Sequence, residues 1–119
     1  MSIVANEHDS PLSIEDIQLI DSTKLSALDK HHLRLLAHCL GSFRLMAKDD
    51  RGGDLPDRDR IENWLKEVHH LNNEDSFLMS LVEQFDFAAI QLEKIAVKMA
   101  ISPLELTLEH LIVTLEKAG

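Results

Sequence analysis

Residues 74–99 read EDSFLMSLVEQFDFAAIQLEKIAVKM, and this stretch decides the fold. Its apolar positions recur at alternating steps of three and four residues over about seven turns, the periodicity of an α-helix. They are Leu78, Leu81, Phe85, Ala88, Leu92, Ile95 and Met99. Three flanking residues, Val82, Ala89 and Ala96, make this face wider than a coiled-coil seam. The pattern predicts the central helix of a compact all-helical domain.

The opposite side of this central helix is also apolar toward its C-terminal end, where Phe87, Ile90, Val97 and Ile101 fall. A helix that is apolar on two sides has to be covered twice. We expect the last helix to cover one side and a second copy of the chain to cover the other. Leu106 and Val113 point away from the inward face of the last helix, so they extend the expected surface of this homodimer.

Local start signals place the other helices. A Ser followed three residues later by Asp predicts a short helix at 13–21 and a long, mostly buried one over 26–47. After a glycine-containing loop at 49–55, Pro56 and Asp57 are expected to begin a surface helix, and Asn73 is expected to cap the central one. The sequence Ser102-Pro103-Leu104-Glu105 predicts that the last helix begins there. The predicted fold is all-α, a small bundle of four main helices plus a short N-terminal helix.

Composition limits the class of protein. At 119 residues, 45% of them hydrophobic, the chain fits one domain, which we place at 12–119 after a flexible N-terminus at 1–11. No apolar run is long enough for a membrane span, and the first ten residues do not resemble a signal peptide. The single cysteine, Cys39, excludes a disulfide within the chain, and we expect a reducing, cytoplasmic location.

Charge is unevenly distributed along this acidic chain, whose formal net charge is −9. All five arginines, Arg34, Arg44, Arg51, Arg58 and Arg60, lie between residues 31 and 73, and the segments on both sides are acidic. Solubility and local ion pairing explain such a pattern in most proteins. The alternative explanation of the charge pattern is a charged surface that contacts a partner. We assign to this surface the five arginines and two acidic residues of the last segment, Glu105 and Glu109.

Catalytic and metal-binding patterns are weak. Glu67 and His70 have the spacing of a helical di-metal ligand pair, but the inward positions of the central helix carry no carboxylate to complete such a site. The neighbours His38 and Cys39 diverge by roughly 100° on a helix, so they do not form a catalytic dyad. We therefore expect no enzyme activity, no bound metal and no cofactor.

Three functions remain open from the sequence. The leading function is that of a small acidic protein–protein interaction module, which acts as an adaptor, regulator or inhibitor. Its expected partner is another protein, and a basic protein is the candidate. The second is a helix-turn-helix regulator of nucleic acid, because residues 92–115 read as helix, tight turn and helix. Its second helix is acidic, however, which disfavours phosphate binding. The third is a metal-dependent helical enzyme.

Overall fold

The computed structural model describes residues 12–47, 54–72 and 75–118, and in these ranges it is all-helical, as predicted. The elements are α2 (Ile14–Ser22), α3 (Ala27–Ala47), α4 (Arg58–His69), α5 (Ser76–Met99), the short 3₁₀ helix η1 (Pro103–Glu105) and α6 (Leu108–Ala118). The flexible N-terminus predicted at 1–11 and most of the predicted loop at 49–55 lie outside the described residues. None of the described helices is both long and apolar enough to cross a membrane.

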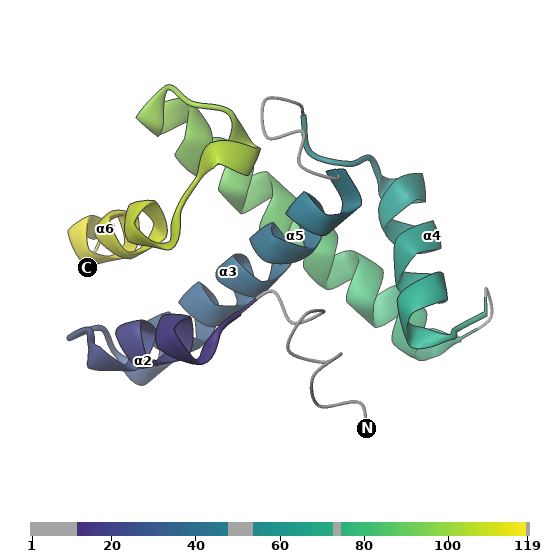
Figure 1. The fold of residues 1–119 in the computed structure, drawn as a ribbon, viewed down its shortest axis with the longest axis horizontal. Coiled ribbons are helices and arrows are strands. Elements are labelled where there is room, and N and C mark those ends of the chain that lie inside the picture. The colour runs from purple at the N-terminus through teal and green to yellow at the C-terminus, as the bar shows by residue number, and fades with distance from the viewer. Residues whose placement is uncertain (1–11, 48–53, 73–74, 119) are drawn as a thin grey trace.

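The central helix predicted from residues 74–99 is α5. The helices α3 and α4 and the turn η1 all pack against α5. Figure 1 shows α3 crossing α5, with α4 to the right of the crossing. The predicted inward face is the core: Leu78, Val82, Ala88 and Leu92 are fully buried. Phe85 is also buried, and its ring meets that of Phe43 from α3 edge-on, with centroids 5.6 Å apart.

The first turn predicted for the last helix, η1, does pack against α5, but the helix that follows it, α6, does not cover α5 as predicted. It packs against α3 instead, so α3 contacts α2, α5 and α6, and also η1. The cause is the connection after α5. Ala100 adopts a left-handed conformation with φ 58°, and the amide of Ile101 bonds back to the carbonyl of Ala96, which ends the helix and turns the chain away.

The last segment also begins later than predicted. Pro103 to Glu105 form only the single turn η1, after which Leu106 is extended (φ −60°, ψ 143°). The hydroxyl of Thr107 accepts a hydrogen bond from the amide of His110 at 3.2 Å, and this second start signal begins α6. The predicted tight turn after α5 is present at Ala100, but the helix predicted to follow it directly is wrong, and the helix-turn-helix alternative loses its geometric basis.

Two helix starts also differ from the prediction by a few residues. The N-cap of α4 is Asp57, whose side chain accepts from the amide of Arg60, so Pro56 lies before the helix and not in its first turn. The N-cap of α5 is Asp75, which accepts from the amide of Phe77. The predicted cap Asn73 lies outside the described residues.

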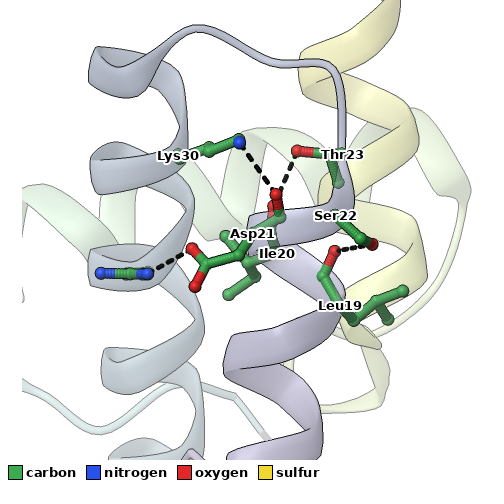
Figure 2. A network of polar contacts seen from close by, with 7 residues as sticks. Leu19, Ile20, Asp21, Ser22, Thr23 and Lys30 are labelled. Carbon is green, nitrogen blue, oxygen red and sulfur yellow. Dashed lines mark hydrogen bonds and ion pairs between the residues drawn. The ribbon is translucent and has the colours of Figure 1, made fainter.

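Polar side chains of α3 bind the C-terminal end of α2 and stabilise it. The last turn of α2 has no basic residue of its own to meet its exposed carbonyl groups. Lys30 of α3 donates to the carbonyl of Asp21 at 2.9 Å, and Thr23 donates to the carbonyl of Ile20 at 2.8 Å (Figure 2). Arg34 of α3 pairs with the side chain of Asp21. These cations stabilise the negative end of the α2 dipole.

Candidate protein-docking surface

The outer face of α5 carries a row of apolar side chains that the described part of the chain leaves uncovered. Phe87 is 46% exposed, Ile90 54% and Val97 74%. The residues of this face are three or four positions apart, so they form one line along the helix. We call the line Phe87, Ile90, Lys94 and Val97 the α5 stripe.

The α5 stripe has a shaped surface. A shallow depression of about 510 Å³ is lined by Ile90, Glu93, Lys94, Val97 and Lys98. A second groove of about 390 Å³ shares Glu93 and Val97 with it and is bounded by residues 54–56 and by Pro103. Ile90 and Val97 of the stripe therefore line a concave region whose rim carries both acidic and basic groups. Such a region suits the side chains of a partner protein better than a flat surface would.

The other predicted apolar contacts lie in different environments. Ile101 is half-buried and packs against the core, and Val113 on α6 is 39% exposed. Leu106 was predicted to face outward, but it is fully buried. Its extended backbone after η1 directs the side chain inward, whereas an unbroken helix would have directed it away from the core. Leu106 is thus removed from the candidate surface.

The arginines assigned to a contact surface make contacts within the chain, except Arg51, which lies outside the described residues. Arg34 pairs with Asp21 of α2, and Arg58 of α4 pairs with Asp86 of α5. Two others bind backbone carbonyl groups: Arg44 donates to Leu104 and Leu106, and Arg60 donates to Met46 near the end of α3. The bonds of Arg44 and Arg60 join separate elements, so we assign these two side chains to the fold.

The acidic residues assigned to the contact surface are exposed. Glu105 accepts from the amide of Ser102 at 3.1 Å, which closes the capping box of η1. Glu109 lies in the first turn of α6, where a negative charge suits the helix dipole. Each has a local structural role, and neither lies on the α5 stripe.

A second apolar surface was missed by the sequence analysis. Leu28 at the start of α3 is 76% exposed and Ile14 of α2 is 68% exposed, and Ile17 and Leu19 are also exposed. Leu28 fits the apolar spacing of the buried face of its helix, so periodicity alone predicts that it is buried. Its position in the first turn, beyond the reach of the packed middle of α3, is the signal that would have marked it as exposed.

The buried thiol of Cys39 has no reactive character. The residue is fully buried, and burial raises the pKa of the thiol to about 12, so the nucleophilic thiolate is almost absent at neutral pH. We expect Ellman's reagent to leave the native protein unmodified and to titrate one thiol per chain after unfolding in guanidinium. Rapid modification of the native protein would contradict this placement of α3.

His38 links folding to pH. His38 is exposed on one side, and the partial burial of its ring against the core lowers the pKa of the imidazole below the usual 6.5; the nearby His69 lowers that pKa further. The ring meets Phe85 edge-on, with centroids 6.4 Å apart. As the pH falls through 6.5, the unfolded chain binds a proton at this position more readily than the folded chain does. Folding stability contributed by His38 is therefore present above that pH and is lost below it.

A substitution tests this linkage. We expect the free energy of unfolding to fall less in His38→Gln than in the unsubstituted protein when the pH is lowered from about 7.5 to about 5.5. Urea unfolding at the two pH values measures both changes. The control is His31→Gln, which changes an exposed histidine about two turns earlier on the same side of α3. An unchanged pH dependence in His38→Gln, or an equal change in His31→Gln, would show that His38 is not responsible.

The histidines and carboxylates do not gather into a metal site in the described ranges. No group of three or more His, Cys, Asp or Glu side chains there is arranged to hold a metal ion. The Glu67 and His70 pair named from its spacing lies at the exposed end of α4, where His70 ends the helix with φ 55°. Nothing in the described residues therefore favours the metal-dependent alternative.

These features define a small all-helical protein with exposed apolar side chains along the outer face of one helix. The chain belongs to the family of the NDH complex assembly factor CRR9, since the family model matches residues 12–119. This match covers all of the described helices. Comparisons with curated proteins and with solved structures gave no match.

Proposed function

We propose that this chain is a non-enzymatic assembly factor that binds a protein of the NDH complex through the α5 stripe. The match to the CRR9 family over residues 12–119 carries the first part of this proposal. The exposure of Ile90 and Val97 in a concave region supports the second, because an apolar surface left uncovered in one chain is available to another.

The acidic charge of the chain adds a second element to this proposal. With a net charge of −9, the chain attracts a basic partner over a distance of about one Debye length, which speeds the encounter. The apolar stripe then determines how long the complex lasts. We expect added salt to slow association of the chain with a purified NDH complex protein and to leave dissociation nearly unchanged. A dissociation rate that rises steeply with salt would instead assign the complex to the acidic surfaces.

Removing the protein from its own cells tests the role in assembly. An assembly factor is needed to build a complex and not to make its parts. We expect cells without this chain to contain less of the assembled NDH complex, with the individual proteins still synthesised. Native gel electrophoresis with detection of one NDH complex protein measures both. An unchanged amount of assembled complex would overturn the proposal.

A further inference from the structure

The charges beside the α5 stripe have no ion pair within the described residues. Glu93, Lys94 and Lys98 are exposed and appear in none of the salt bridges found there. Elsewhere on α5, Asp86 is neutralised by Arg58. Lys94 and Lys98 are one turn apart, so their like charges repel each other within the helix. Within the described part of the chain, no ion pair therefore competes with a partner for these three charged groups.

The placement of these charges specifies the geometry of that partner. With the apolar stripe facing a partner helix, Glu93 lies along one edge of the stripe and Lys98 along the other. In coiled-coil terms, Phe87 and Lys94 take position a, Ile90 and Val97 take position d, Glu93 is at g and Lys98 is at the following e. A g residue reaches the e residue five positions later on a parallel neighbour.

We propose that in the free protein a second copy of this chain occupies the α5 stripe, with the two α5 helices side by side and parallel, and that an NDH complex protein takes the place of this copy when it binds. A two-fold axis along the helices places Glu93 of each copy against Lys98 of the other, which makes two identical ion pairs. An antiparallel arrangement would instead place like edges together, with Glu93 against Glu93 and Lys98 against Lys98. The charge pattern thus selects the parallel dimer.

The row of side chains between these edges fits the same arrangement. Ile90 and Val97 of the two copies meet in successive layers and bury the apolar area that one chain leaves exposed. Lys94 comes between them at position a, where a single polar residue weakens a pair of helices but specifies two strands and their register. Glu93 of the other copy lies next to it and offsets the repulsion between the two lysines. Few turns of one helix are involved, so we expect a dissociation constant in the micromolar range.

Charge reversal with purified full-length protein tests this dimer. We expect sedimentation equilibrium from about 5 to about 500 µM to show a monomer–dimer equilibrium. Glu93→Lys and Lys98→Glu, each alone, place like charges together and should weaken the dimer about tenfold. An equimolar mixture of the two variants, and the double variant, should associate as tightly as the unsubstituted protein. Glu109→Lys, which makes the same change of charge on α6, should have no effect.

Each of these results is decisive. A chain that stays monomeric throughout this concentration range would overturn the dimer. Single variants that associate as tightly as the unsubstituted protein would overturn the parallel arrangement. In an antiparallel dimer each charge faces the same residue of the other copy, so reversing it leaves the repulsion and the affinity unchanged. Recovery in the mixture shows that the single variants are folded. The experiment contains no NDH complex protein, so its failure is distinct from a failure of the proposed function.

Discussion

Leu92→Ala is expected to lower the free energy of unfolding by about 2–5 kcal/mol. Leu92 is fully buried at the centre of α5. Truncation removes apolar contacts and leaves a cavity that α3 and α4, packed on the same helix, can only partly close. Chemical denaturation followed by circular dichroism at 222 nm, the helix signal, measures this loss.

The matched control for Leu92→Ala is Val97→Ala on the same helix. Val97 is 74% exposed, so its truncation should change stability by no more than about 0.5 kcal/mol. Together the two variants determine which face of α5 is inside. A small loss for Leu92→Ala with a large loss for Val97→Ala would show that the helix is turned the other way.

Arg44→Met is expected to cost about 2–3 kcal/mol, the second largest effect. The Arg44 side chain extends from α3 to the last segment, where Nε donates to the carbonyl of Leu104 at 3.1 Å and the guanidinium also donates to the carbonyl of Leu106. Methionine retains the apolar stem but leaves both partly buried carbonyl groups without these donors. Urea unfolding measures the loss.

The control for Arg44→Met is Arg34→Met, also on α3. Arg34 pairs with Asp21 on the surface, and exposed pairs of this kind contribute no more than about 1 kcal/mol. Equal losses for the two arginines would contradict the role given to Arg44 in holding η1 and the start of α6 against α3.

The helices could be predicted because their periodicity is local. The spacing of Leu78, Phe85 and Leu92 indicates both the helix and its buried face, and the bounds of α2 and α3 follow from Ser-x-x-Asp start signals. Such signals depend on residues within one or two turns. This is why the all-α fold is confirmed from the sequence alone.

The course of the chain after α5 could not be predicted in the same way. Ser102-Pro103-Leu104-Glu105 does form a capping box, but the turn it begins is only one turn long. The helix stops after this turn because the extended Leu106 and the preceding Leu104 can then both be buried. Arg44, 60 and 62 residues earlier in the chain, also binds the carbonyl groups of these two residues. These are tertiary interactions, and they override local helix propensity. The packing of α6 on α3 follows from the same turn.

The candidate surface was partly visible in the sequence. Two apolar sides on one helix mark Phe87, Ile90 and Val97 as available for contact, and all three are exposed. Exposure in a single chain does not identify the partner, so their role in binding stays a prediction. The arginines were harder to interpret, since a cation that caps a helix and one that binds a partner look alike in a sequence.

The most direct test of the proposed function measures binding of a purified NDH complex protein to two variants. Val97→Asp places a charge on the α5 stripe, and Leu28→Asp places the same charge on the second apolar surface at nearly the same exposure, 76% against 74%. We predict at least a tenfold loss of affinity, about 1.4 kcal/mol, for Val97→Asp and little change for Leu28→Asp. Full binding by Val97→Asp, or loss of binding only in Leu28→Asp, would contradict the assignment of the α5 stripe.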